Sequence, residues 1–454
     1  MKYKCQKCGF IHFGEMPDGY YCPLCHSNFS YFELIEEEEK KYNRKTIKED
    51  NPGINRIYEK CINCGVCSRT CENIVGIKDD NVCVNCGQCI LTCPTGALTP
   101  KYDYQKVLEY INNPEYTVIA LTSPAVRVGI GDAFGYKPGE FLEGKMVSSL
   151  KKIGFDYVFD TTFGADLTSM EEAFELKNRL EKNELMFSSC CPSWVKYACV
   201  YHPELISNLS TCKSPIGMEA SVIKNIYLKE EELDPNNTII VAVTPCTSKK
   251  AEILNTDCDL VITTSELAHL IKEENIDFKS LEDAEFDTIN GSSSGTIYGA
   301  SSGVTLSVIR VLYYYMTGRD LTSDEISIKD KEYYKEIKVK INKEIITCAA
   351  VSTLHNLEKV LKIKDEFNFI EVMNCSGGCI NGGGQVLMPI NEKDSIRDAR
   401  IKELFKKDVK PYIKYPYKNP VIKDLYEDYL DEPGSSKCEE LLHIEHRTIK
   451  KEGL

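Results

Sequence analysis

The stretch CINCGVCSRTCENIVGIKDDNVCVNCGQCILTCP, residues 61–94, decides the fold of the N-terminal part of this chain of 454 residues. It holds two copies of the spacing C-x2-C-x2-C-x3-C, one starting at Cys61 and one at Cys83. A repeat of this kind does not arise by chance, and dense thiols in a reducing cytosol indicate metal ligation rather than disulfides. The stretch therefore predicts two iron–sulfur clusters, each held by four cysteines.

These residues resemble the bacterial ferredoxin repeat, whose fold carries two 4Fe-4S cubanes and exchanges the fourth ligand between them. The resemblance implies a first cluster and a second cluster with the following ligands: Cys61, Cys64, Cys67 and Cys93 for the first, and Cys83, Cys86, Cys89 and Cys71 for the second. Glu72 replaces the proline that usually follows the fourth cysteine of the first copy, which changes a turn but removes no ligand. Such modules carry single electrons, so another part of the chain must supply the bond chemistry.

Toward the N-terminus, two CxxC knuckles supply four more thiols, namely Cys5, Cys8, Cys22 and Cys25. Four converging thiolates suit one tetrahedral ion. Zinc would make this site a structural staple for a small module. The segment CGFIHFGEMPDGYYCPLC resembles the rubredoxin-like module of rubrerythrins, which implies iron and electron transfer. Spacing alone does not separate the two metals, and the resemblance favours iron.

Composition limits the partners and the compartment. The net charge of -14 argues against nucleic acid and anionic membranes, which need basic patches. No apolar run approaches the roughly 20 residues of a membrane span, and the start MKYKCQKC lacks a signal-peptide core. We therefore expect a cytoplasmic protein with no nucleic-acid or membrane partner.

After residue 100, short apolar runs alternate with helical patterns, which predicts a multidomain α/β protein with parallel sheets flanked by helices. Ligand sites in such sheets lie at the carboxyl ends of strands. Cysteines follow the runs there, in three loops: SSCCPSW with Cys190 and Cys191, TPCTSKKAE with Cys246, and NCSGGC with Cys375 and Cys379. Adjacent side chains point in different directions, so one cluster would not normally take both members of the pair. If one member of the pair is left out, the other four thiols of the three loops make a full set of ligands for a cubane.

In this order the loops resemble the three signature segments of iron-iron hydrogenases, and the likeness extends from about residue 53 to the C-terminal tail. It implies reversible conversion of 2 H+ and 2 e- into H2 at an H-cluster. This cofactor would be a cubane held by Cys191, Cys246, Cys375 and Cys379, with Cys379 bridging to a two-iron unit that carries CO, CN- and an azadithiolate. A small redox protein such as ferredoxin and maturation proteins for the two-iron unit are the implied partners.

The predicted domains follow from these motifs and resemblances. They are a rubredoxin-like module (1–35), an acidic linker (36–52), a ferredoxin-like domain (53–100), a two-lobed H-cluster domain (101–405) and a small-subunit-like helical segment that wraps it (406–454).

A proton relay is the second requirement of this chemistry. The resemblance makes Cys190 the proton donor and acceptor, and a thiol of pKa about 8.5 suits that role near neutral pH. A capping box at Thr168 and Glu171 predicts the start of a helix with Glu172, Glu175 and Arg179 on one face. A solvated charged face is the alternative. By position, the resemblance implies a relay that runs, with water in the gaps, through Cys190, Glu172, Ser210, Glu175 and Arg179 to solvent.

Residues around the two-iron unit are also implied by position. Ser123, Pro124, Lys249 and Met373 match the family's pocket, with Lys249 donating to cyanide unless it is a surface lysine. Thr244 stands where the family usually has methionine. This departure leaves space and adds a hydroxyl, which puts catalytic bias, rate and inhibitor sensitivity in doubt, but not cluster assembly.

Other interpretations remain for the whole chain and for one thiol. A regulatory H2 sensor usually loses the relay, and a cluster-assembly relative never holds the two-iron unit; the relay residues, Lys249 and Cys190 weigh against both. Cys212, two residues after Ser210, is hypothesised to influence the redox or oxygen response of the pocket. The remaining cysteines are expected to be buried and inert.

Overall fold

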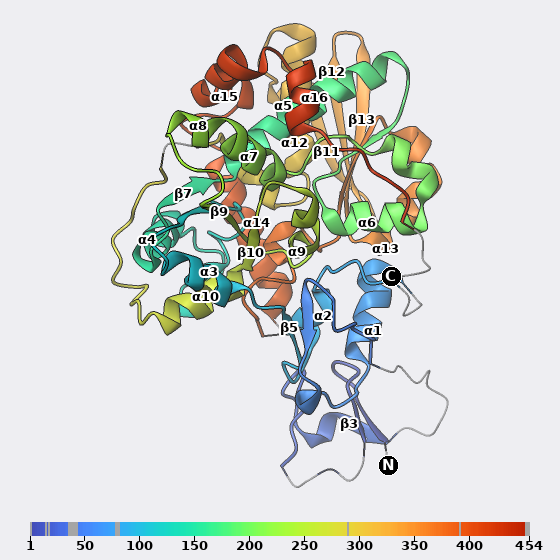
Figure 1. The fold of residues 1–454 in the computed structure, drawn as a ribbon. Helices are drawn as coiled ribbons and strands as arrows, with labels where there is room; N and C mark the ends of the chain where they lie inside the picture. The colour runs from blue at the N-terminus through green and yellow to red at the C-terminus, as the bar shows by residue number, and fades with distance from the viewer. Residues whose placement is uncertain are drawn as a thin grey trace.

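The computed structural model describes residues 2–13, 16, 19–34, 44–77, 82–287, 290–389 and 392–449. Residues 36–43 of the predicted acidic linker lie outside them. Figure 1 shows the N-terminal segments, in blue, extending below a larger body. Among the described residues no helix combines the length and hydropathy needed to cross a bilayer.

The N-terminal module is a small antiparallel sheet. Strands β1 (Lys2–Cys5), β2 (Ile11–Phe13) and β3 (Phe32–Leu34) pair in the order β2-β1-β3. Its core includes Phe10 and Leu24, and this core also contacts Val66 of the following domain. The guanidinium of Arg69 donates to the carbonyl of Gly9 at 3.3 Å. The module therefore packs directly on the ferredoxin-like segment.

The cysteine repeat forms two equivalent halves. Helix α1 (Val66–Thr70) and helix α2 (Gln88–Thr92) each begin after a left-handed glycine, Gly65 (φ 69°) and Gly87 (φ 67°). The hydroxyls of Thr70 and Thr92, at matching places in the two copies, lie 2.8 Å apart. Strands β4 (Ile54–Arg56) and β5 (Leu98–Pro100) pair antiparallel and close the domain.

The first sheet after residue 100 is entirely parallel. Its strands are β6 (Thr117–Thr122), β7 (Tyr157–Asp160), β9 (Thr238–Thr244) and β10 (Leu260–Thr263), in the order β10-β9-β6-β7. One face packs on α3 (Tyr104–Ile111), α4 (Glu143–Ile153) and α10 (Thr264–Glu273). The other packs on α5 (Thr162–Glu181) and α7 (Pro215–Val222). Three predicted apolar runs are thus strands buried on both faces, which confirms the α/β architecture.

The second sheet is mixed and differs from the predicted parallel arrangement. Its order is β11 (Ile326–Asp330), β12 (Lys335–Ile341), β13 (Glu344–Ser352), β14 (Phe369–Met373) and β8 (Met186–Phe187). Pairs β13-β14 and β14-β8 are parallel, whereas β11, β12 and β13 form an antiparallel meander. A two-residue loop after Ile341, with Asn342 at φ 55°, turns the chain directly back. Helix α12 (Gly303–Thr317) covers one face, and α6 (Pro192–Tyr201) with α13 (Leu354–Val360) covers the other.

Helix α5 lies between the sheets and against α12 and α7. It begins at Thr162, six residues before the predicted start, so the capping box predicted at Thr168 is wrong. The Thr168 hydroxyl instead donates to the Gly164 carbonyl at 2.9 Å inside the helix. The helix starts immediately after β7, where the chain enters the buried layer, rather than at a solvent-exposed cap.

The C-terminal part of the chain is helical. Its helices are α14 (Lys393–Lys407), α15 (Pro420–Leu425) and α16 (Ser436–Leu442). Ile422, Leu430 and Leu442 join the core that contains α5 and α12, and Figure 1 shows α15 and α16, in red, over that end of the body. The short helices α8 (Leu228–Glu230), α9 (Lys249–Glu252) and α11 (Ser293–Thr296) complete the α-helical elements of the described residues.

Candidate active site and metal centres

One cavity collects the residues predicted for the active site. It lies beyond the carboxyl ends of β6, β9 and β14, because Ser123, Cys246 and Cys375 each follow one of these strands. The predicted residues that line it are Ser123, Pro124, Cys190, Cys191, Thr244, Cys246, Lys249, Met373, Cys375 and Cys379. Strand direction explains why the loops after β6 and β9 meet, since these parallel neighbours end at the same edge of one sheet, and the packing of the second sheet adds the loop after β14.

The thiols in this cavity have two different surroundings. Burial, and then the proximity of Cys191, raises the pKa of Cys246 to about 11. Burial likewise raises the pKa of Cys375, followed by the effects of Cys246 and Cys379. Cys190 differs, because after burial its pKa is raised most by Glu172. Four thiols thus line one space, which fits a polynuclear iron–sulfur group, while the charged neighbour with the largest effect on Cys190 is a carboxyl group, Glu172.

Lys249 is buried, so the alternative of a surface lysine is wrong. Its side chain is 9% exposed, and its ammonium donates to Glu252 at 2.6 Å and to the Cys190 carbonyl at 3.4 Å. Burial lowers the pKa of Lys249, but Glu252, together with Cys246 and Cys190, raises it by more, and the net shift is upward. The cavity therefore contains a fixed positive charge, suited to an anionic ligand.

Three of the predicted relay residues, Ser210, Glu175 and Arg179, form a row joined by hydrogen bonds. Glu172 is fully buried, and neither carboxylate oxygen has a hydrogen-bond partner in the described part of the chain. Burial, and then Glu175, raises the pKa of Glu172 to about 8. Ser210 donates to Glu175 at 2.9 Å, and Arg179 donates to the other oxygen of Glu175 at 2.7 Å. This helix face, for which a solvated charged surface was the alternative interpretation, is thus mostly inside the protein.

Two histidines beside this row were not predicted. His446 Nε2 donates to the Ser210 carbonyl at 2.9 Å, and His443 Nδ1 lies 2.8 Å from the Thr211 hydroxyl. Both come from the C-terminal segment, more than 200 positions away, so no local pattern could have indicated them. Cys212 is buried beside them, and its amide donates to the Ser210 hydroxyl at 3.2 Å.

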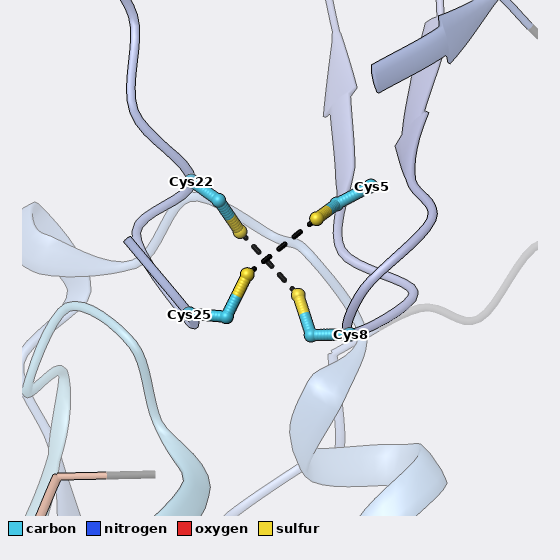
Figure 2. A group of neighbouring side chains, drawn as sticks. All are labelled: Cys5, Cys8, Cys22 and Cys25. Carbon is cyan, nitrogen blue, oxygen red and sulfur yellow. Dashed lines mark hydrogen bonds between the residues drawn. The ribbon is translucent and has the colours of Figure 1, made fainter. Parts of the chain in front are cut away.

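The N-terminal thiols converge on one point, as Figure 2 shows. Cys5 and Cys25 sulfurs lie 3.5 Å apart, and Cys8 and Cys22 sulfurs 3.4 Å. All four sulfurs lie within 4.8 Å of one another. This geometry suits a single tetrahedral ion.

The eight cysteines of the repeat fall into two groups. Cys93 lines the same small cavity as Cys61, Cys64 and Cys67, although it belongs to the second copy. The neighbours that raise the pKa of Cys86, after burial, include Cys71 and Cys83. Cys93 thus lies with three cysteines of the other copy, and Cys71 lies near cysteines of the second copy, while the exchange of fourth ligands that the resemblance implied stays a prediction.

Gln88 joins the ferredoxin-like domain to the active-site cavity, and sequence reasoning missed it. Its amide donates to the Cys375 sulfur at 3.2 Å and to the Asn381 carbonyl at 2.8 Å. Gly87 permits this approach, since a Cβ there would lie 2.5 Å from the Thr247 hydroxyl. The only available signal was its position between two cluster cysteines.

Comparison with known proteins agrees with this arrangement. The profile of the iron only hydrogenase large subunit, C-terminal domain, matches residues 116–383; the iron hydrogenase small subunit matches 394–448, and a 4Fe-4S binding domain matches 77–99. Iron hydrogenase 1 of Clostridium pasteurianum is 37% identical over 430 residues, which are 86% of this chain and 75% of the relative. The periplasmic Fe hydrogenase large subunit of Nitratidesulfovibrio vulgaris is 36% identical over 60% of this chain and 69% of its own.

A solved structure extends the likeness to three dimensions. An apo FeFe-hydrogenase from Chlamydomonas reinhardtii superposes with a TM-score of 0.68 at 29% identity, covering 76% of this chain and 98% of the other. The profile match spans more than half of this chain, and the cysteine-lined cavity lies within it. The chain is therefore a member of the iron-only hydrogenase family, the oxidoreductases that act on molecular hydrogen.

Proposed function

We propose that this chain interconverts H2 with two protons and two electrons in the cavity that Cys190 and the four neighbouring thiols line. Cys191, Cys246, Cys375 and Cys379 would hold the cubane of an H-cluster. When bound, that cofactor supplies iron at which H2 is made or split. The observation that carries the proposal is the presence in one cavity of four thiols suited to be ligands, a fifth thiol whose pKa is raised by a buried carboxyl group, and a buried ammonium.

Matured protein tests this function directly. We expect H2 evolution with a reduced low-potential donor, together with infrared bands of CO and CN-. Protein that shows those bands but neither evolves nor consumes H2 would favour a sensor, and protein without the bands would favour a cluster-assembly relative.

Electrons would travel along the N-terminal modules into the cavity. The core of the N-terminal module includes Cys64 of the first predicted cluster. Cys67 of that cluster is among the groups that raise the pKa of Cys89 in the second. Cys86 of the second predicted cluster is in turn among the groups that raise the pKa of Cys375 at the cavity. These neighbours support the order mononuclear ion, first 4Fe-4S cluster, second 4Fe-4S cluster, H-cluster.

Gln88 is expected to tune the last step of this path. A hydrogen bond to a ligand sulfur stabilises negative charge and so raises the reduction potential of the cluster. Gln88→Leu should lower the midpoint potential of the active-site cubane, measured by infrared-monitored titration, and change the ratio of H2 oxidation to H2 evolution. Thr92→Val, in the same helix but bonded to Thr70, is the control. An unchanged potential in Gln88→Leu would contradict the assignment.

The N-terminal ion is proposed to be iron, because its site adjoins the first predicted cluster. Cys8→Ser should remove one iron per chain in elemental analysis, and with it the visible absorption of a tetrathiolate iron site, while the other iron remains. Loss of one zinc per chain instead would show that the site holds a structural zinc ion.

Protons would move from Cys190 through Glu172, Ser210, Glu175 and Arg179. The hydrogen bonds from Ser210 and Arg179 to Glu175 support the outer half. For the inner half, Glu172 lies close enough to raise the pKa of the Cys190 thiol, and water would bridge the remaining gaps. A carboxyl with a pKa of about 8 holds a proton at neutral pH and releases it at small cost, as a relay needs.

Thr244 and Cys212 keep their proposed roles near this site. Thr244 lines the cavity with Met373, so its hydroxyl is proposed to influence bias and inhibitor sensitivity. Unchanged oxygen inactivation in Cys212→Ala would remove the role of that thiol. A ferredoxin-like partner, maturation proteins and a cytoplasmic location stay predictions; one relative is a periplasmic enzyme.

A further inference from the structure

A second buried carboxyl group lies near the cavity, and neither the relay nor the ligand set uses it. Glu219, on α7, is fully buried, and both its carboxylate oxygens lack a hydrogen-bond partner in the described part of the chain. Within those same residues, Glu172 is the only other carboxyl group of which this is true. Buried polar atoms are nearly always satisfied, by protein or by internal water.

The surroundings of Glu219 connect it to the active-site cavity. Thr161 and Pro215 both line the cavity, and Glu219 is one helical turn beyond Pro215. The Thr161 hydroxyl makes no hydrogen bond of ordinary length among the described residues. It lies close enough to the Glu219 carboxyl group to lower the pKa of that group. Gly164 allows this close packing of α5 on α7, since a Cβ there would lie 3.0 Å from the Cβ of Glu219. These unpaired polar atoms together indicate a site for internal water.

On its outer side, Glu219 adjoins an ion-pair network that reaches the surface. Arg127 is buried and donates to Asp160 at 3.2 Å and also to Glu143. The Glu143 side chain is 38% exposed. Burial raises the pKa of Glu219 to about 8; the interaction with the Thr161 hydroxyl lowers this pKa, Asp160 raises it by less, and Arg127 lowers it by less still. A proton held on Glu219 therefore has polar neighbours toward both the cavity and solvent.

We propose that Glu219 is the inner proton-carrying group of a second route, which leaves the cavity past Thr161 and reaches solvent through internal water and the carboxylates of Asp160 and Glu143, which Arg127 holds together without itself releasing a proton. This inference rests on the proposed function. The two routes leave from different places along α5, since Thr161 immediately precedes that helix and Glu172 lies about three turns further on.

The protonation of Glu219 is testable in apo protein, without any cluster chemistry. A carboxyl whose pKa is higher in the folded than in the unfolded chain binds more protons when folded, so it lowers stability as pH rises from about 4.5 to about 8. Glu219→Gln should therefore raise the apparent Tm relative to the parent, by an increment that grows between pH 5 and pH 8.5. If Glu219 were instead a charged partner of Arg127, the variant would lose stability as pH rises, and the proposal would be overturned.

Turnover of the matured enzyme tests the route itself. Glu172→Gln should retain a residual rate, and Glu172→Gln with Glu219→Gln should fall a further tenfold or so below it, because the second path is then closed as well. Glu172→Gln with Glu219→Asp, which keeps an ionisable group, should recover part of that loss. A double glutamine variant as active as Glu172→Gln alone would overturn the second route. Full activity in Glu172→Gln alone would overturn the first route, and the stability measurement would still decide the state of Glu219.

Discussion

Glu172→Gln is expected to lower H2 evolution by about 10²- to 10⁴-fold while leaving the active-site cofactor in place. Glutamine has nearly the shape of the glutamate but cannot give up a proton and take it back. Glu172 is fully buried next to Cys190, so bulk water cannot replace its carboxyl group. The measurements are H2 evolution at saturating donor and the infrared bands of CO and CN-, which should keep the parental intensity.

Glu171→Gln is the matched control for this variant. Glu171 neighbours Glu172 on α5 and is equally buried, but it accepts hydrogen bonds from Tyr426 and from the Gly434 amide in the C-terminal segment. Its loss should lower thermal stability and affect turnover far less. Parental H2 evolution in Glu172→Gln would contradict the relay order.

Serine variants of the two adjacent cysteines are expected to have clearly different effects on iron content and on activity. Cys191→Ser should lose the iron of the active-site cubane and all activity, because a hydroxyl is a poor replacement for a thiolate ligand. Cys190→Ser should keep the full iron content and the CO and CN- bands, and lose about 10²- to 10⁴-fold in H2 evolution, because a serine hydroxyl does not ionise near neutral pH. Iron analysis, infrared spectra and turnover on the same preparations give the comparison.

This pair also tests the central assignment. Each variant serves as the control for the other, since both replace a sulfur atom by an oxygen atom, at adjacent positions. If Cys190→Ser lost cubane iron and Cys191→Ser kept it, the ligand and the proton carrier would have been exchanged, and the proposed mechanism would fail.

The cysteine spacing was informative because ligand sets at tight turns are local. The positions of Cys61 to Cys71 and Cys83 to Cys93 leave few ways to hold a cluster, and buried apolar runs such as residues 117–122 and 238–244 predict parallel strands. The antiparallel meander was missed because charged, partly exposed strands such as β12 carry a weaker apolar signal. The start of α5 was misplaced because a plausible capping pair lay inside the helix.

By itself, the sequence determined which thiols are available, that strand ends present them, and that Glu172, Glu175 and Arg179 share a helix face, since each depends on neighbouring residues. Only the tertiary structure decided that Glu172 is the charged neighbour of Cys190, that Lys249 is buried, that Gln88 reaches Cys375, and that the buried Glu219 carboxyl group lies beside Thr161. Those facts depend on burial and on contacts between distant segments. The packing of the two sheets brings these segments together, and no local sequence pattern predicts it.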